Sequence, residues 1–155
     1  MTALVIMGVS GSGKTTVGEL LASQTGGTFH DGDDYHPPEN VQKMASGTPL
    51  TDEDRQEWLI SLAALIRDAE SLIIIACSAL KASYRDVLAG AEFVFLHGPS
   101  SLLAERIGER SDHYMPPDLL QSQLDTLEPP EDALILDIRH SPEELVRQIR
   151  DHFDL

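Results

Sequence analysis

Near its N-terminus the chain reads Gly8-Val9-Ser10-Gly11-Ser12-Gly13-Lys14-Thr15, which fits the pattern G-x-x-x-x-G-K-S/T at every defined position. In this pattern the glycines let backbone N–H groups surround phosphates, the lysine neutralises β- and γ-phosphate oxygens, and the Ser/Thr hydroxyl binds Mg²⁺. The alternative is a Gly/Ser-rich turn that precedes a helix by coincidence. That alternative is weak, because the pattern also requires a strand before it and a helix after it, and both are predicted here.

The residues around this loop supply the strand and the helix. Residues 3–7 form a continuous apolar run, as in a strand buried on both faces, and Val17, Leu20 and Leu21 recur at helical spacing within residues 15–23. Further strands are predicted at residues 28–30, 72–77, 93–96 and 133–137, and helices at 40–46, from 51 onward, at 101–110 and at 141–152. This alternation predicts a three-layer α/β fold, with a mainly parallel sheet flanked by helices.

The composition limits the class of protein. With 155 residues the chain suits one domain, and 11 Lys and Arg against 26 Asp and Glu give a net charge of −15. This charge argues against binding to nucleic acids or to an anionic membrane, and an anionic substrate would need a local cluster of cations. The longest apolar run, residues 72–77, is too short to cross a bilayer, and no secretion signal is visible. Cys77 is the single cysteine, so a reducing, cytoplasmic location is expected.

An acidic segment, Asp31-Gly32-Asp33-Asp34, follows the second predicted strand. In a doubly wound sheet this position lies beside the phosphate loop, because ligands bind at the carboxyl ends of such strands. A carboxylate there can hold Mg²⁺ through water and can accept a hydrogen bond from the hydroxyl that attacks the γ-phosphate. The alternative is a solvated Asp/Gly turn. Carboxylates beside a triphosphate repel it unless a metal ion lies between them, so we expect at least one of these acids to work with Mg²⁺.

The rest of the sequence separates the classes of protein that carry such a loop. A GTPase switch would carry N-K-x-D, but Asn40 is the only asparagine and Val41 follows it. Motors and large ATPases usually have an apolar strand that ends in Asp, whereas the most apolar strand after the loop ends in Cys77-Ser78. A chain of this size suits a small-molecule kinase. Two alternatives stay open: a kinase of another small acid such as shikimate, which shares D-x-D after strand two, and a slow nucleotide-binding switch.

Longer segments carry patterns that are more specific than the loop. They are Asp31-Gly32-Asp33-Asp34-Tyr35-His36-Pro37, Lys43-Met44-Ala45-Ser46-Gly47-Thr48-Pro49-Leu50-Thr51-Asp52-Glu53-Asp54-Arg55, Cys77-Ser78-Ala79-Leu80-Lys81 with Tyr84-Arg85-Asp86, and His113-Tyr114-Met115-Pro116 with Ser122-Gln123 and Thr126-Leu127-Glu128-Pro129. In this order, over nearly the whole chain, these segments resemble the gluconokinases. The resemblance implies a P-loop fold like that of nucleoside monophosphate kinases. It also implies Mg²⁺-dependent transfer of phosphate from ATP to the 6-position of D-gluconate, by a cytosolic enzyme that is often a homodimer.

The predicted organisation is a single kinase domain, residues 1–155, with a lid-like excursion from the sheet around residues 112–130. The turns Met115-Pro116-Pro117 and Pro129-Pro130 bracket this excursion. The family usually has Gly where this chain has Asp112, and Phe where it has Tyr114. Both differences fall in the expected lid, so we expect them to affect closure or affinity more than the class of reaction.

The few cations of the chain are candidates for holding anionic ligands. Arg55 follows three acids at a helix start and is either a surface ion-pair partner or, as the resemblance implies, a cation that faces the acceptor. Lys81 and Arg85 are four residues apart, so they are predicted to share one helix face near the active edge. Arg106 and Arg110 have the same spacing and either clamp adenine and phosphates or lie on a solvated face.

The predicted roles are then as follows. The catalytic candidates are Lys14 and Asp33, and the metal-binding candidates are Thr15 and Asp31. The ATP-binding candidates are Gly8, Val9, Ser10, Gly11, Ser12, Gly13, Lys14, Thr15, Thr16, Arg106 and Arg110. The substrate-binding candidates are Asp33, His36, Arg55, Lys81, Arg85 and His113, of which His36 and His113 depend on the resemblance. Cys77 and Trp58 are predicted to belong to the core, and the six histidines show no zinc-binding spacing.

Overall fold

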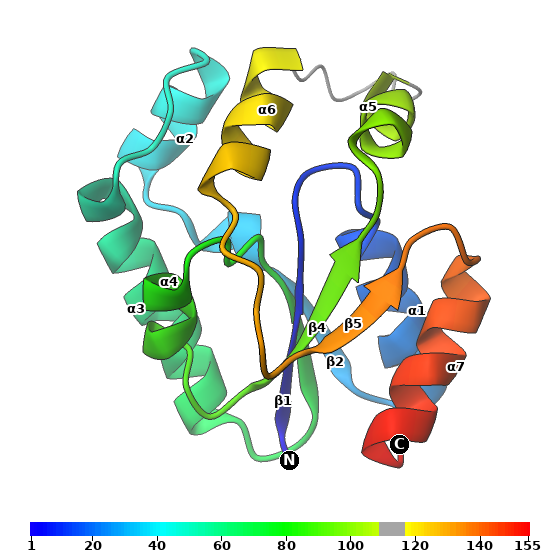
Figure 1. The fold of residues 1–155 in the computed structure, drawn as a ribbon. Helices are drawn as coiled ribbons and strands as arrows, with labels where there is room; N and C mark the ends of the chain where they lie inside the picture. The colour runs from blue at the N-terminus through cyan, green and yellow to red at the C-terminus, as the bar shows by residue number, and fades with distance from the viewer. Residues whose placement is uncertain (109–116) are drawn as a thin grey trace.

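The computed structural model describes residues 1–108 and 117–155, which form one five-stranded sheet with helices around it (Figure 1). The strands are β1 (Ala3–Met7), β2 (Thr28–Asp31), β3 (Ile73–Ala76), β4 (Glu92–His97) and β5 (Leu134–Asp137), in the order β2-β3-β1-β4-β5. Every neighbouring pair is parallel. The predicted α/β fold class and each predicted strand are confirmed.

The helices also follow the prediction closely. They are α1 (Lys14–Thr25), α2 (Pro38–Ala45), α3 (Asp52–Asp68), α4 (Ala82–Val87), α5 (Ser100–Gly108), α6 (Pro117–Thr126) and α7 (Pro142–Phe153). The sequence did not predict the short 3₁₀ helix η1 (Gly32–Tyr35) in the acidic segment. It forms because the Asp31 carboxylate accepts a hydrogen bond from Asp33 N at 3.0 Å and so caps the turn.

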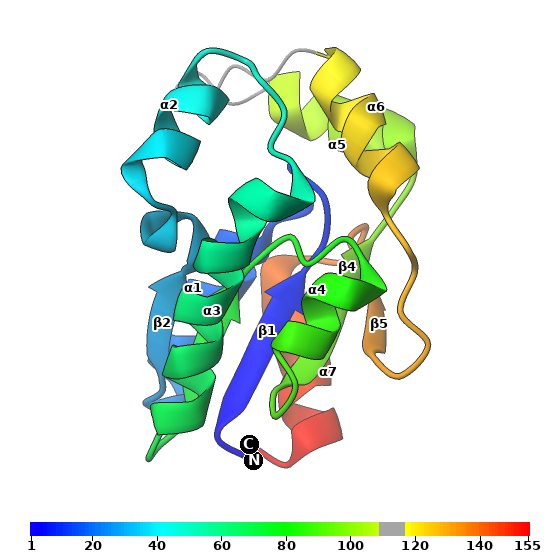
Figure 2. The same cartoon turned by 90° about the vertical axis from the view of Figure 1, so that its left-hand side faces the viewer.

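Helices cover both faces of the sheet because its central strands are apolar on both faces. In β1, Leu4 and Ile6 belong to the core cluster shared with α1 and α7, whereas Val5 and Met7 belong to the cluster shared with α3 and α4. Figures 1 and 2 show α1 and α7 together on one face, and α3 with α4 on the other. These are the predicted three layers, and Trp58 of α3 lies in the core, as expected.

The register of the strands fixes which residues meet at the carboxyl edge of the sheet. Ile6 of β1 and Asp31 of β2 are both paired with Ala76 of β3, which lies between these two strands. The loop that follows Met7 of β1 and the helix η1 that follows Asp31 of β2 therefore lie on opposite sides of the residues that follow Ala76. Parallel pairing thus brings the phosphate loop and the acidic segment to one place.

The N-terminus of α3 is fixed by a capping box. Thr51 Oγ1 accepts from Asp54 N at 3.1 Å, and the Asp54 carboxylate accepts from Thr51 N at 2.9 Å, so the helix predicted from residue 51 onward has Thr51 as its N-cap. The same carboxylate accepts from Lys43 Nζ of α2 at 2.8 Å. These hydrogen bonds, with that of Lys43 the largest cause, lower the pKa of Asp54 to about 2. The box and the ion pair join α2 to the start of α3.

Three helices stand beyond the carboxyl ends of the strands. Figure 2 shows α2 on one side of this end of the molecule, and α5 and α6 on the other, with the loop after β1 below them. The helices that cover the sheet lie alongside the strands, so α2, α5 and α6 are free to form the surroundings of a site. Within the described ranges, no helix has the length and apolar character needed to span a membrane.

Candidate functional site

The phosphate loop runs from β1 to the start of α1, as predicted. Gly13 caps α1 with φ +95°, and Gly11 has φ +85°, a backbone region that side chains other than glycine rarely adopt. A Cβ on Gly11 would also lie 3.1 Å from Leu103 O, so this glycine lets the loop lie against α5. Lys14 Nζ donates to Val9 O at 3.0 Å, which holds the ammonium group across the loop.

The loop also contains a buried hydroxyl group. Ser12 is 1% exposed, and its Oγ has no hydrogen-bond partner among the described residues. Buried polar groups in proteins are nearly always paired, so this atom is suited to a ligand that completes the loop. The N–H groups of the first turn of α1 and the positive end of the helix dipole favour an anion at the same place. The loop therefore fits the phosphates of a nucleotide.

The acidic segment presents two carboxylates in different ways. Asp31 Oδ1 is engaged with Asp33 N, whereas the side chain of Asp33 is 79% exposed. The hydroxyl-bearing residues Thr15 and Thr16 lie exposed in the first turn of α1. Among the described residues, no three His, Cys, Asp or Glu side chains are grouped to hold a metal. Mg²⁺ usually keeps several waters and takes one or two protein ligands plus phosphate oxygens, so Thr15 and Asp31 are a fitting pair.

Cys77 lies between the phosphate loop and the acidic segment, and charged residues of both affect the pKa of its thiol. Burial raises the pKa of its thiol to about 12, and smaller effects come from the charges of Lys14, which lowers it, and Asp33, which raises it. These two charges belong to the segments that follow β1 and β2, the strands on either side of β3, so the phosphate loop and the acidic segment both border the end of β3. The buried, protonated thiol confirms that Cys77 belongs to the core.

The side chain of His36, next to Asp33, is largely buried. Its side chain is 4% exposed and stacks on Trp58, with ring centroids 4.3 Å apart and an interplanar angle of 16°. Trp58 Nε1 in turn donates to Gly32 O at 2.7 Å, which ties α3 to η1. His36 Nε2 is 4.0 Å from Asp33 Oδ1. Burial, and then the positive charge of Arg55, lower the pKa of His36 to about 4, so the ring is neutral at physiological pH.

Arg55 and Lys81 come together around a tyrosine. Arg55 Nη1 donates to Leu50 O at 2.8 Å and to Tyr84 Oη at 3.1 Å, and its guanidinium lies 5.4 Å from the Tyr84 ring centroid. Lys81 Nζ lies 5.6 Å from the same centroid and donates to Asp52 at 2.9 Å. Tyr84 Oη donates to Asp52 Oδ1 at 2.5 Å, and this bond lowers the pKa of Asp52 more than any other interaction. The structure thus brings two predicted acceptor-side cations to one tyrosine.

The prediction that Lys81 and Arg85 share a helix face is wrong. Lys81 has extended backbone and precedes α4 as its N-cap residue, so the spacing of four residues does not place both side chains on one helical turn. The Arg85 guanidinium donates to two backbone carbonyls, those of Ala79 at 2.8 Å and Glu128 at 2.8 Å. These bonds tie the segment after β3 to the segment before β5.

The segment after α5 reaches the phosphate loop through α6. Gln123 Oε1 accepts from Ser10 N at 2.8 Å, and Gln123 Nε2 donates to Ser10 Oγ at 3.2 Å. Arg106 of α5 donates to Ile138 O, just after β5. The candidates Arg110 and His113, and the family differences at Asp112 and Tyr114, lie outside the described residues. The part of the expected lid that is described therefore contacts the loop.

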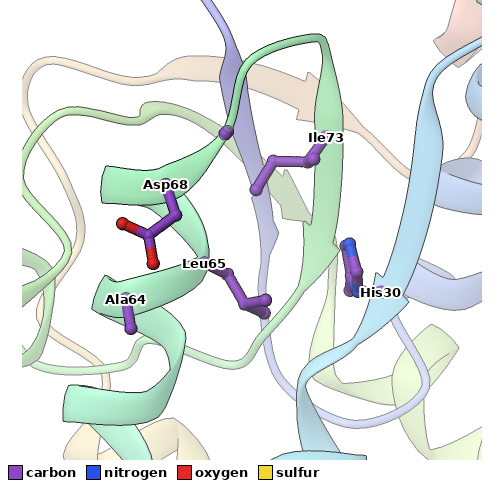
Figure 3. Close-up of a pocket in the computed structure, with 6 residues that line it drawn as sticks. His30, Ala64, Leu65, Asp68 and Ile73 are labelled. Carbon is purple, nitrogen blue, oxygen red and sulfur yellow. The ribbon is translucent and has the colours of Figure 1, made fainter.

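Two hollows in the described surface lie away from this cluster. One, of about 270 Å³, lies between β2 and α3 and is lined by His30, Ala64, Leu65, Asp68, Ala69 and Ile73. Figure 3 shows that the Asp68 carboxylate points away from the His30 ring, so the hollow does not gather polar groups. The other, of about 430 Å³, lies at the ends of β4 and β5, where His97, Asp137 and Arg139 line it. Neither contains a catalytic candidate.

The structure adds residues to which the sequence gave no role in the site. Tyr84 and Asp52 join the two cations, Gln123 holds α6 to the loop, and Asn40 contacts His36. Trp58 was predicted only as a core residue, yet it is also the stacking partner of His36. Asn40 offered no such signal, because it is the first residue of the predicted helix 40–46, where asparagine is a common N-cap; in the structure it lies inside α2, which begins at Pro38.

Comparison with known proteins adds the family to this geometry. The family model for shikimate kinase matches residues 10–152. A probable gluconokinase from Xenopus tropicalis is 42% identical over an alignment 176 positions long, which covers 97% of this chain and 93% of that protein. A gluconokinase from Gluconobacter oxydans is 48% identical over 136 residues, or 83% of this chain and 76% of that protein. The chain belongs to the gluconokinases, within the shikimate kinase family.

Solved structures agree with this family. A gluconokinase from Sinorhizobium meliloti, 47% identical, matches the chain with a TM-score of 0.87 over 95% of this chain and 88% of its own. The shikimate kinase of Bacteroides thetaiotaomicron has a TM-score of 0.73 at 15% identity, which shows a common fold alone. As a gluconokinase-family protein, the chain has a P-loop kinase fold in which the phosphate loop follows β1 and the acidic segment follows β2, both at the carboxyl edge of the sheet.

Proposed function

We propose that this gluconokinase-family protein transfers the γ-phosphoryl group of ATP to the 6-hydroxyl of D-gluconate. The observation that carries the proposal is that the strand register brings the phosphate loop after β1 and η1, which contains Asp33, to either side of the end of β3 at the carboxyl edge of the sheet. A donor phosphate on the loop would then lie near a carboxylate able to accept a proton from the acceptor. The curated relatives are named gluconokinases, and this similarity supports gluconate rather than shikimate as the acceptor of this protein.

Asp33 is proposed as the group that accepts the proton of the attacking hydroxyl. As this proton moves to the carboxylate, the hydroxyl oxygen forms a bond to the γ-phosphorus, and the bond between that phosphorus and the β,γ-bridging oxygen breaks. The products are the 6-phosphate of gluconate, ADP and a proton. Asp33 suits this role because its side chain is 79% exposed at the edge where the substrates would meet.

Lys14 and the first turn of α1 are proposed to stabilise the charge that develops during transfer. The Lys14 ammonium would exchange its bond with Val9 O for phosphate oxygens. We propose Thr15 and Asp31 as the protein side of a Mg²⁺ site, in which the metal supplies charge neutralisation to the phosphates. Asp31 keeps this possibility while capping η1, because the cap uses only Oδ1.

The carboxylate of gluconate is proposed to bind at the cation pair around Tyr84. Both described hydrogen bonds of Arg55 start from Nη1, so the edge of the guanidinium formed by Nε and Nη2 suits a carboxylate. Lys81 is bound to Asp52, which is exposed, so an incoming carboxylate can share the ammonium group. At a net charge of −15 this local cluster must overcome a repulsive field, which salt screens beyond about 8–10 Å.

The remaining predictions from the family are part of the same proposal. Residues 112–130 would act as a lid, which the contact of Gln123 with Ser10 supports. Arg106, Arg110 and the loop residues 8–16 would bind ATP, and His113 the acceptor. A homodimer and a cytoplasmic location follow from the family resemblance.

The proposed reaction is tested by measuring ADP release with a coupled assay over a panel of acceptors. With MgATP we expect turnover on D-gluconate to exceed turnover on shikimate and other small acids at least about a hundredfold, since an ill-fitting acceptor loses several contacts in the transition state. A shikimate preference would support the other small-acid kinase. Equal, slow ADP release with and without acceptors would support the nucleotide-binding switch and overturn the proposal.

Loss of the Arg55 side chain is expected to weaken gluconate binding specifically. A shielded guanidinium–carboxylate pair contributes about 1.5–3 kcal/mol, so Arg55→Ala should raise the KM for gluconate at least about tenfold. The KM for ATP should stay within about threefold, because Arg55 lies on α3 and not on the phosphate loop. Steady-state kinetics with each substrate varied in turn give both values.

Two further variants make this result specific. Arg55→Lys keeps the charge but not the bidentate fork, so its effect on gluconate should be intermediate. Arg67→Ala removes an exposed arginine from the last turn of the same helix and should leave both KM values unchanged. Equal losses for both substrates in Arg55→Ala would show that this residue supports the fold or the lid, and would contradict its role in binding the acceptor.

A further inference from the structure

Asn40 is a buried polar residue at the back of the proposed site. It is 3% exposed on α2, and its amide nitrogen makes two contacts. Asn40 Nδ2 donates to the backbone carbonyl of Asp54 at 2.7 Å, and it lies 3.2 Å from His36 Nδ1. The residue therefore joins the first turn of α3 to the imidazole that stands behind Asp33.

The hydrogen bond to Asp54 O determines which group of the Asn40 amide faces His36. A backbone carbonyl can only accept, so the group of Asn40 that faces Asp54 O must be the NH₂ group. Its other hydrogen is directed at His36 Nδ1, which must then carry a lone pair rather than a proton. In a neutral imidazole the proton consequently lies on Nε2, the atom 4.0 Å from Asp33 Oδ1.

We infer that Asn40 is a positioning residue that fixes His36 as the Nε2–H tautomer, so that the imidazole presents a permanent hydrogen-bond donor beside Asp33. This assignment deepens the proposed function, because it specifies what His36 offers to the acceptor. A gap of 4.0 Å is too long for a hydrogen bond. An acceptor oxygen placed between the two groups can accept from Nε2–H while its own hydroxyl proton is directed at Asp33.

The groups that surround the ring keep it in this state. Trp58 covers one face by stacking, which excludes water. Arg55 of α3 is the neighbouring cation that opposes protonation, and Asp33 of η1 is the carboxylate that faces Nε2. Burial is the largest cause of the low pKa of His36, about 4. His36 is therefore a donor and not a general base, since its one basic nitrogen, Nδ1, is occupied by Asn40.

The tautomer can be measured without any assay of activity. In protein labelled with ¹⁵N-histidine, the ring nitrogens of His36 are assigned by their absence in His36→Gln. Nitrogen–carbon-bound-proton correlation spectra then distinguish a bare ring nitrogen from a protonated one. We expect a bare Nδ1 and a protonated Nε2 from pH 5.5 to pH 8, values that lie above a pKa of about 4. A proton on Nδ1, or a doubly protonated ring in this range, would overturn the inference.

The variant Asn40→Asp exchanges the donor that faces His36 Nδ1 for an acceptor. A carboxylate at this position accepts only, so Nδ1 should become protonated, and the pKa of His36 should rise because the imidazolium gains an anionic partner. At pH 8, for the neutral ring, we expect the spectrum to show a proton on Nδ1 and none on Nε2, and kcat/KM for gluconate to fall about tenfold or more, the equivalent of one hydrogen bond. The KM for ATP should change less than about threefold. A changed tautomer with unchanged gluconate kinetics would overturn the positioning role.

Controls separate this role from charge and from folding. Gln42→Glu adds the same charge to an exposed position of α2 and should leave the spectrum and the kinetics as they are. If Asn40→Asp does not fold, the spectrum of the unaltered protein still decides the tautomer. The spectrum does not depend on which acceptor is phosphorylated, so failure of the gluconate assay and failure of this inference are distinguishable.

Discussion

A Lys14→Ala variant is expected to fold normally and to lose phosphoryl transfer about a hundred- to a thousandfold or more in kcat. The loss follows because Lys14 is the loop cation that would neutralise phosphate oxygens as charge develops, and removal of one such preorganised donor has an effect of this size. Stability should change little, because Lys14 is not a buried residue and its described hydrogen bond is made to Val9 O within the loop. Initial rates at saturating ATP and gluconate, with thermal unfolding of the same samples, test both expectations.

Lys14→Arg is the matched comparison for charge. It keeps a cation, but its planar fork is larger than the ammonium that the loop surrounds, so we expect intermediate activity. A decrease of the same size in Arg67→Ala, far from the loop on α3, would indicate a general effect of lost positive charge. A folded Lys14→Ala protein with near-normal turnover would remove the kinase assignment.

Local patterns in the sequence were sufficient to predict most of the strands and helices of the fold. The continuous apolar run of residues 3–7 predicts a strand buried on both faces, and β1 is buried at every position. A helix is predicted from residue 51 onward, and α3 begins at Asp52 with Thr51 as its N-cap. Each of these signals involves residues close together in the chain, so the structure needed no long-range information to satisfy them.

Signals that depend on tertiary structure could not be read in the same way. The spacing of Lys81 and Arg85 predicted a shared helix face, but the chain is still extended at Lys81, so the helical rule does not apply to it. The stacking of His36 on Trp58 joins the residue after η1 to α3, two segments with no common periodicity. The bond of Gln123 to Ser10 spans 113 residues. Such contacts follow from the way helices and strands pack together, and local patterns in a single sequence do not reveal this packing.

The distribution of lysine shows how an acidic chain can serve anionic ligands. All three lysines of the sequence, Lys14, Lys43 and Lys81, belong to the carboxyl end of the sheet or to the elements beside it. In the first turn of α3, Asp54 pairs with Lys43 of α2 and Asp52 pairs with Lys81, which precedes α4. This turn therefore binds two lysines from different segments of the chain. The net charge of −15 thus describes the rest of the surface more than the site.

Asp33→Asn is expected to lower kcat about a hundred- to ten-thousandfold, the range of a lost general base, while the KM for ATP changes less than about threefold. The carboxamide has nearly the same shape, but it cannot take the proton of the attacking hydroxyl. The side chain is 79% exposed, and the cap of η1 uses the backbone N–H of Asp33 and the carboxylate of Asp31, so the fold should persist. The decisive values are kcat and both KM values in a variant whose circular dichroism is unchanged.

The neighbouring Asp34 provides the control for Asp33. It is exposed on the same 3₁₀ helix, so Asp34→Asn removes the same charge from nearly the same place and should retain most of the activity. If both variants lost activity equally, the negative charge of the segment, rather than a positioned base, would be what matters. If Asp33→Asn raised only the KM for ATP, Asp33 would belong to the surroundings of the metal, and the proton of the 6-hydroxyl would have to be accepted by a different group. A loss confined to kcat and to Asp33 would leave this carboxylate as the proton acceptor, because such a pattern requires a group that acts in the transition state and not in ATP binding.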